Sequence, residues 1–292
     1  FLSHADADHV DGLVPLLNHQ QITVNNIWHN GIGVFDDPGF NTDLGRLQNG
    51  RLVTRHSSLD DLGSATLADG FGDWIAAVRA SNANYQALDA GDGIVDVGDP
   101  AVELEVLGPV REDDGSYQWF GSTASTSKTI NGHSLVFRLT HGVVRTFVSG
   151  DLNEQGSENL LAPPGAALRV NAHVFKSPHH GSHDFHQPLL NAISPLVTVV
   201  SSGDNPDHGH PRATFLGSVG RASRSDEAMI FSTEIAAAFT DASDTPHTVA
   251  TSGPTTGLMT TSADISWATW GLQVKNTVPA PSVRAYSTAP RT

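Results

Sequence analysis

The last two thirds of the chain alternate short apolar stretches with helical segments, and this order limits the possible folds more than any other feature. Stretches rich in Val, Ile, Leu and Phe predict strands at 94–97, 102–107, 135–139, 143–148, 172–176, 196–201 and 228–231. Apolar residues at helical spacing predict helices at about 154–161, at about 185–192 and after Pro211. We therefore expect an α/β fold with mixed layers of helices and strands.

The first third of the chain has weaker patterns. Residues 10–17 and 74–78 carry apolar side chains at helical spacing, and residues 22–24 predict a short strand between these two helices. Residues 30–70 are rich in Gly, Asp and Asn and have little periodicity. We expect this stretch to form a long surface excursion.

Composition divides the chain into two expected parts. The tail from residue 241 is rich in Ser, Thr, Ala and Pro. We expect one domain over residues 1–240 and a C-terminal extension over 241–292 that is at most partly ordered. No run of about 18 apolar residues is present, and the first residues lack the basic and apolar pattern of a signal peptide. The sequence therefore favours a soluble, cytoplasmic protein.

Charge and cysteine content exclude several classes of function. The chain has no Cys, which excludes disulfide scaffolds, thiolate zinc sites, iron–sulfur clusters and cysteine nucleophiles. Its 16 basic and 31 acidic residues give a formal net charge of −15. Such a charge argues against a broad electrostatic surface for nucleic acids, so an anionic substrate would have to be attracted locally.

The opening segment from Ser3 to Gly12 concentrates side chains that bind metals. His4, Asp6, Asp8 and His9 supply four potential ligands within six residues, directly before a predicted helix. Imidazole nitrogens and carboxylate oxygens together suit zinc or manganese, and several of them on one loop can hold two ions. The alternative is a polar surface turn in which Asp8 caps the helix.

Three predicted strands also end in polar residues. Asp151 follows the strand at 143–148, the pair His179 and His180 follows the strand at 172–176, and His210 lies between the strand at 196–201 and the next helix. Nine of the 15 histidines fall between residues 133 and 210. A strand-end aspartate is placed to bridge two metals, although Gly150-Asp151 alone also fits a turn or a helix cap. Together these segments predict a site at one rim of a sheet.

The opening segment resembles the HxHxDH signature of the metallo-β-lactamase-fold hydrolases, in the variant with Asp at the second His position, here Asp6. With Ser149-Gly150-Asp151, Pro178-His179-His180-Gly181-Ser182 and Gly209-His210-Pro211, the chain is similar over residues 1–235 to the hydrolase domain of the competence DNA-uptake protein ComEC and its free-standing relatives. The resemblance implies an αββα sandwich with a dinuclear metal site. The family has two or more strands before its first metal loop, and we expect this chain to lack them.

The resemblance also implies a role for each of these residues. His4, Asp6 and one of His179 and His180, or a neighbouring side chain, would serve one metal, Asp8 and His9 the other, and Asp151 would bridge the two. Asp6 in place of His adds an oxygen ligand to one site, which favours manganese without excluding zinc. In this branch of the family, the stretch that contains Asn131 and His133 lies near the site. Either of these two side chains could approach the metals.

The expected reaction is hydrolysis by a metal-bound hydroxide, because two divalent ions lower the pKa of a shared water and no serine or cysteine triad competes. Asp8 and Asp151 would act in catalysis as ligands, and His210, or whichever of His179 and His180 is not a ligand, would protonate the leaving group. Lys176, Ser182 and Arg212 lie beside these motifs and are candidates to hold a phosphate.

The expected substrate is a phosphodiester, which would make the protein a nuclease or a phosphodiesterase. The net charge does not support nucleic acid, but two bound metals would add about four local positive charges. A small ester or lactone is the alternative substrate, and a non-catalytic metal-binding or partner-completed domain is the alternative of another class. β-Lactamase activity is disfavoured, because a fold does not fix a function.

Overall fold

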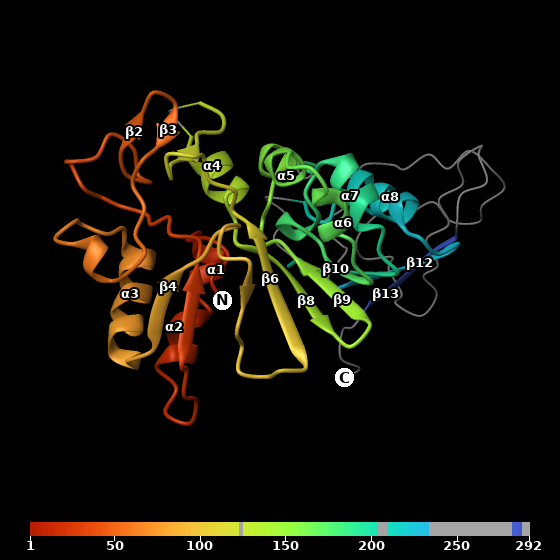
Figure 1. The fold of residues 1–292 in the computed structure, drawn as a ribbon, viewed down its shortest axis with the longest axis horizontal. Helices are drawn as coiled ribbons and strands as arrows, with labels where there is room; N and C mark the ends of the chain where they lie inside the picture. The colour runs from red at the N-terminus through yellow and green to blue at the C-terminus, as the bar shows by residue number, and fades with distance from the viewer. Residues whose placement is uncertain (123–124, 204–208, 234–281, 288–292) are drawn as a thin grey trace, which may run out of the picture.

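The computed structural model describes residues 1–122, 125–203 and 209–233, together with the backbone of 282–287. Its described part is mixed α/β, as the alternation of strands and helices predicted (Figure 1). The largest of its three sheets has eight strands in the order β13-β12-β11-β10-β9-β8-β6-β5. These are β5 (Ile94–Val95), β6 (Val102–Gly108), β8 (Val136–His141), β9 (Val144–Val148), β10 (Val174–Lys176), β11 (Val197–Val200), β12 (Glu227–Ser232) and β13 (Ser282–Ser287).

In the eight-stranded sheet, the pairing of neighbouring strands changes from antiparallel to parallel at β9. Each neighbouring pair among β5, β6, β8 and β9 is antiparallel, and β8 and β9 form the predicted hairpin. From β9 to β13 every pairing is parallel. A short turn can join only antiparallel strands, whereas parallel strands need a crossover, which helices supply here. The carboxyl ends of β9, β10 and β11 therefore lie at one edge of the sheet.

The crossover helices gather on one side of this sheet (Figure 1). They are α5 (Glu154–Leu161), α6 (Ala166–Arg169), α7 (Gln187–Ile193) and α8 (Ala213–Ala222). Phe147 and Phe175 on the strands and Phe215 on α8 are fully buried in the core between these layers. Removing such apolar side chains from water is the main force that packs the helices against the sheet.

A second core stabilises the N-terminal part. Here β1 (Asn26–His29) pairs in parallel with β4 (Asn84–Ala87), beside α3 (Asp69–Ser81). Trp74 and Ile75 of α3 are buried together with Leu2 and Val10 of the opening segment. The remaining elements are α1 (Ala7–Val10), α2 (Leu13–Leu17), β2 (Leu47–Gln48), β3 (Arg51–Leu52), the 3-10 turn η1 (Asp60–Leu62), β7 (Tyr117–Gln118) and α4 (Ser127–Gly132).

Two predictions for this part are wrong. The strand expected at 22–24 lies at Asn26–His29 instead, because pairing with β4 decides which residues are extended there. The stretch 30–70 is not only a surface excursion. Phe35 and Leu44 are buried in the second core, and β2 and β3 form a three-stranded sheet with β7. Within an irregular stretch, isolated apolar residues can be buried without leaving a periodic signal.

The opening segment joins the two parts of the fold. The Leu2 amide donates to the Trp28 carbonyl of β1 at 2.8 Å, and the Leu135 amide, just before β8, donates to the Ser3 carbonyl at 2.7 Å. These two hydrogen bonds hold the start of the chain between β1 and β8. His4 and the residues after it are thereby fixed beside the large sheet.

Two expectations concern the rest of the chain. Most of the predicted extension, residues 241–281 and 288–292, lies outside the described residues, while 282–287 form β13 beside β12. Among the described residues, no helix has the length and apolar character needed to cross a membrane.

Candidate metal centre

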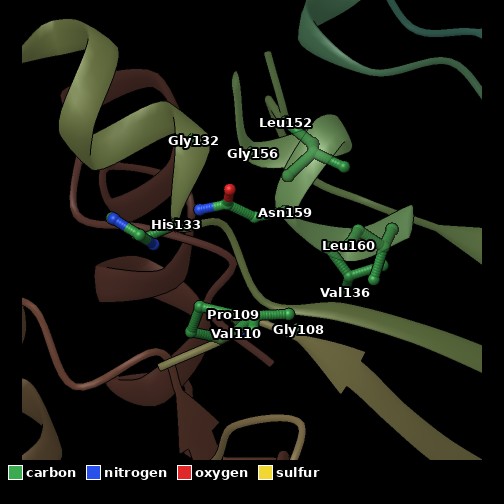
Figure 2. A pocket seen from close by; sticks show the side chains of 10 residues that line it. All are labelled: Gly108, Pro109, Val110, Gly132, His133, Val136, Leu152, Gly156, Asn159 and Leu160. Carbon is green, nitrogen blue, oxygen red and sulfur yellow. The ribbon is translucent and has the colours of Figure 1, made fainter. Parts of the chain in front are cut away.

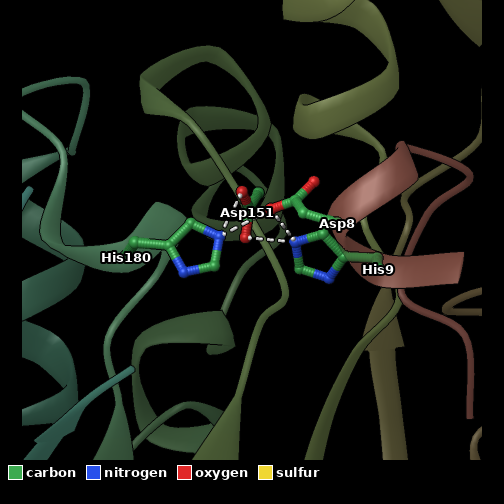
Figure 3. Close-up of side chains that lie close together, drawn as sticks. All are labelled: Asp8, His9, Asp151 and His180. Carbon is green, nitrogen blue, oxygen red and sulfur yellow. Dashed lines mark hydrogen bonds and ion pairs between the residues drawn. The ribbon is translucent and has the colours of Figure 1, made fainter. Parts of the chain in front are cut away.

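The predicted site residues gather at the edge of the sheet where the parallel strands end. Asp151 follows β9, and His180 lies in the 3-10 turn η2 (His179–Gly181) after β10. The opening segment brings Asp8 and His9, at the start of α1, to the same place. Figure 3 shows the Asp151 carboxylate between the imidazole of His180 on one side and the side chains of Asp8 and His9 on the other.

Four of these side chains form a compact cluster. One possible ligand atom from each of Asp8, His9, Asp151 and His180 lies within 4.8 Å of the others. His9 Nε2 is 3.1 Å from Asp151 Oδ1. His180 Nε2 is 3.0 Å from Asp8 Oδ2 and 3.4 Å from Asp151 Oδ2. Asp151 therefore contacts both histidines, one through each of its oxygens.

The other predicted ligands surround this cluster. The rings of His4 and His9 lie 4.1 Å apart between their centroids, and His4 Nε2 is 3.6 Å from Asp6 Oδ2. His179 Nε2 is 3.9 Å from Asp151 Oδ2. The structure thus places all seven predicted ligands in one region, and their binding of a metal stays a prediction.

The backbone around the cluster adopts conformations that are unfavourable for most residues. Gly150 has φ +51°, and a Cβ there would lie 2.6 Å from the Ser3 Cβ, so this position requires Gly. His179 and His180 have φ +42° and +52°. Non-glycine residues in this region cost on the order of 1–3 kcal/mol each and concentrate at functional sites.

Hydrogen bonds orient His180 and Asp151. His180 Nδ1 is 2.7 Å from the Ser201 carbonyl oxygen. A carbonyl can only accept, so Nδ1 carries a hydrogen, and Nε2 is the atom directed at the carboxylates. The Asp151 amide donates to Ser134 Oγ at 3.0 Å. Sequence reasoning missed Ser134 and Ser201, although Ser134 lies in the stretch expected near the site.

The contacts within the cluster favour the protonated form of His180 and the ionised forms of Asp8 and Asp151. Hydrogen bonds to Asp151 and Asp8 raise the pKa of His180 to about 10. The hydrogen bond from His180 lowers the pKa of Asp8. Burial alone raises the pKa of Asp151, but the close contacts with His180 and His9 outweigh it and hold that pKa far below its usual value. The two carboxylates therefore attract positive charge, which a proton on His180 can supply.

The available atoms fit a divalent metal. His4 Nε2, His9 Nε2 and Asp151 Oδ1 are buried. His9 Nε2 and Asp151 Oδ1 form an ion pair with each other at 3.1 Å, and His4 Nε2 is 3.6 Å from Asp6 Oδ2, but none of the three atoms makes a well-aligned hydrogen bond within the described residues. Burying polar atoms without a well-aligned hydrogen bond costs free energy, and a cation would satisfy all three. A donor set of imidazole nitrogens and carboxylate oxygens suits zinc or manganese.

Asn131 and His133 differ in their surroundings. His133 Nε2 lies 2.7 Å from the Gln118 carbonyl, and its ring stacks on Phe120 at 4.7 Å, so this imidazole is used in packing. Asn131 is 7% exposed, and its Oδ1 has no hydrogen-bond partner among the described residues. Asn131 Oδ1 is therefore a buried acceptor without a hydrogen-bond partner among the described residues, whereas His133 Nε2 is already hydrogen-bonded.

The predicted proton donor and phosphate-binding residues lie near the cluster. The His210 ring is 5.3 Å from the His179 ring in an edge-to-face arrangement. Lys176, the last residue of β10, has a pKa lowered by burial and partly restored by the charges of Asp151 and Asp8.

A small cavity lies beside His133 (Figure 2). Pro109, Leu152, Asn159 and Leu160 are among the residues that line it. Its volume of about 10 Å³ has room for one water molecule, so it is too small for a substrate.

The chain is similar to a competence protein. Over 82 residues it is 38% identical to competence protein ComA of Neisseria gonorrhoeae, a match that covers 28% of this chain and 12% of that protein. The chain therefore spans a small part of the length of this relative. No family model matches the chain.

Proposed function

We propose that the protein is a metal-dependent hydrolase of the metallo-β-lactamase superfamily, with two zinc or manganese ions at the rim of the large sheet. The observation that carries this proposal is the convergence of His4 Nε2, His9 Nε2 and Asp151 Oδ1, which are buried and face imidazole or carboxylate groups without a well-aligned hydrogen bond among the described residues. The sheets and their helices would then correspond to the αββα sandwich of that superfamily. The similarity to a competence protein supports the same branch of it.

The geometry suggests which residues would hold each ion. Asp8, His9 and His180 would hold one ion, because His180 lies closest to Asp8. His4 and Asp6 would hold the other, and Asp151 would be shared. This arrangement differs from the one that the resemblance alone implied, in which a histidine of the 179–180 pair joins His4 and Asp6.

Bound ions would supply Lewis acidity and lower the pKa of a water towards 7. The chain's own residues would do the rest. Asp8 and Asp151 would hold the ions in catalysis, and Lys176 would attract an anionic group near the rim. His210, or His179 beside it, would donate a proton to the leaving group.

A phosphodiester is the substrate class that we favour. The similarity to a competence protein supports a nuclease or phosphodiesterase, and the two ions would add local positive charge to a chain whose formal net charge is −15. That net charge is the observation that favours the second candidate, a small ester or lactone, because such a substrate needs no extended basic surface.

The test combines metal analysis with turnover. Protein purified without chelator would be analysed for metal by mass spectrometry, and its hydrolysis of bis-p-nitrophenyl phosphate compared with that of Asp151→Ala. We expect about two ions per chain and turnover that the substitution abolishes. Asp89→Ala is the matched control, because Asp89 is as buried as Asp151 but pairs with Arg55 and Arg111.

The other outcomes separate the alternatives. Bound metal with turnover of p-nitrophenyl acetate but not of the phosphodiester would favour the small-ester hydrolase. Bound metal without any turnover would indicate a non-catalytic metal-binding domain. Protein that folds but binds no metal would contradict the metal centre.

A further inference from the structure

One serine hydroxyl contacts two of the proposed metal ligands. Ser3 Oγ lies 3.0 Å from His4 Nδ1 and 3.1 Å from His9 Nδ1. The opposite ring nitrogens face different carboxylates, since His4 Nε2 is near Asp6 and His9 Nε2 is near Asp151. In the arrangement proposed above, these two histidines belong to different ions.

The chemistry of the hydroxyl decides which way these hydrogen bonds run. A histidine that binds a metal through Nε2 carries its hydrogen on Nδ1. A serine oxygen has two lone pairs and can accept two hydrogen bonds, but its single hydrogen can be donated to only one partner. In the metal-loaded protein, Ser3 Oγ therefore accepts from both imidazoles.

We propose that Ser3 is a positioning residue that fixes the metal-binding tautomer of both His4 and His9, and thereby couples the two metal positions. The inference rests on the proposed metal centre. Ser3 would not touch the ions or the substrate. It would act through the orientation and basicity of the two imidazoles.

The surroundings keep this hydroxyl in place. Gly150 approaches Ser3 so closely that a Cβ on it would lie 2.9 Å from Ser3 Oγ. Ser134 does not duplicate its role, because Ser134 Oγ is 3.4 Å from His4 Nδ1 and accepts from the Asp151 amide. Among the described residues, Ser3 supplies the hydrogen-bond partner of His9 Nδ1, and Ser134 reaches only the other histidine.

Four variants test this role through metal affinity. Zinc affinity would be measured by competition with a chromophoric chelator for the wild type, Ser3→Ala, Ser3→Thr and Ser134→Ala. Loss of a hydrogen bond to a metal-bound histidine commonly costs 10–100-fold in affinity, so we expect a loss of that size for both ions in Ser3→Ala. Ser3→Thr keeps the hydroxyl and should restore affinity. Ser134→Ala should also weaken both ions, because it removes the acceptor of the amide of Asp151, the shared ligand, so the exchange measurement below distinguishes the two serines.

A spectroscopic measurement gives an independent readout. In zinc-loaded protein with ¹⁵N-labelled histidine rings, hydrogens on Nδ1 of His4 and His9 that are bonded to Ser3 should exchange slowly with water. Ser3→Ala should accelerate both exchanges, whereas Ser134→Ala should affect His4 alone. Ser149→Ala is the matched control, because Ser149 Oγ is buried and has no hydrogen-bond partner among the described residues.

The outcomes separate this inference from the proposed function. Wild-type protein that binds no zinc would overturn the metal centre and Ser3's role with it. Two bound ions with unchanged affinity and exchange in Ser3→Ala would overturn the role of Ser3 alone. If Ser3→Ala does not fold, Ser3→Thr with wild-type exchange at both rings supports the role, and fast exchange at both rings contradicts it.

Discussion

Histidines gather in two regions of this molecule, and the two clusters have opposite electrostatic character. The rim cluster contains His4, His9, His179 and His180 with the carboxylates of Asp8 and Asp151. The aromatic cluster contains His29, His56, Trp74 and Tyr85 in the N-terminal core. In the rim cluster, imidazole nitrogens face carboxylates. In the aromatic cluster, the rings of His29 and His56 stack on each other at 4.7 Å.

The pKa values show the consequence. Hydrogen bonds to two carboxylates raise the pKa of His180 to about 10, whereas burial lowers the pKa of His56 to about 4 and that of His29 well below its usual value. The same side chain is thus a candidate ligand in one place and a neutral packing group in the other. A count of histidines cannot separate these roles, but the presence of nearby carboxylates can.

The two clusters are also mechanically related. The opening segment that carries His4 and His9 is anchored by Leu2 and Val10 in the same core as Trp74 of the aromatic cluster. The aromatic cluster therefore supports the loop that carries half of the proposed ligands.

The largest effect should separate the clusters by metal affinity. Removal of a direct ligand costs more than the 10–100-fold of an outer hydrogen bond, so we expect His180→Ala to weaken zinc binding by about a thousandfold, or about 4 kcal/mol. His56→Phe keeps an aromatic ring in the other cluster and should leave zinc affinity unchanged. Competition with a chelator measures both. Equal losses of zinc affinity in the two variants would contradict the assignment of metal binding to the rim cluster alone.

Lowering the pH should destabilise the fold through the aromatic cluster, because its buried histidines are neutral in the folded chain. The pKa of His56 is about 4 in the folded chain and about 6.5 when unfolded. Its neutral form contributes stability that is fully present above pH 6.5 and is lost as the pH falls towards 4. We expect this group to reduce the free energy of unfolding by about 3 kcal/mol over that range, and His29 to add to the loss.

Urea unfolding of metal-free protein at several pH values measures this loss. The wild type should be compared with His56→Phe, because carboxylates and His180 titrate in both proteins and cancel in the difference. In His56→Phe, the free energy of unfolding should fall less steeply between pH 6.5 and pH 4 than in the wild type. A parallel pH dependence of the two proteins would mean that His56 is not buried in its neutral form.

At the rim, His210 should affect turnover and leave metal binding intact. A positioned general acid contributes at least about a hundredfold, so His210→Ala should lower kcat by about that factor and remove the alkaline limb of the pH profile. Zinc affinity should not change, because His210 contacts the rim cluster through the ring of His179. Unchanged kcat and an unchanged pH profile would transfer the role of proton donor to His179.

Local patterns explain what the sequence could predict of the fold. Helix α5 lies at Glu154–Leu161, where its periodicity placed it, and the hairpin of β8 and β9 follows from two apolar runs around a short turn. Strand β1 was misplaced, because its position depends on pairing with β4, more than 50 residues later. Pairing between distant strands leaves little signal in either segment alone.

In the candidate site, too, local sequence predicts some features and tertiary packing decides the others. Its candidate ligands are clustered in the sequence, so a motif could identify them. The position of His133 could not be inferred, because its imidazole is held by the Gln118 carbonyl, 15 residues away. The contact of Ser3 with both His4 and His9 depends on how the opening segment bends into α1. Such contacts are set by tertiary packing.

The smallest effect concerns the hydrogen bond inside the aromatic cluster. His56 Nε2 lies 2.9 Å from the Tyr85 hydroxyl, and both groups are buried. Tyr85→Phe keeps the stacked ring and removes this bond, so we expect a loss of about 1 kcal/mol in the free energy of unfolding at neutral pH. Urea unfolding measures it. Zinc affinity should stay unchanged, because the ring is retained in the core that also contains Leu2 and Val10 of the opening segment. A weakened zinc site in this variant would show that the two clusters are coupled more tightly than their shared core requires.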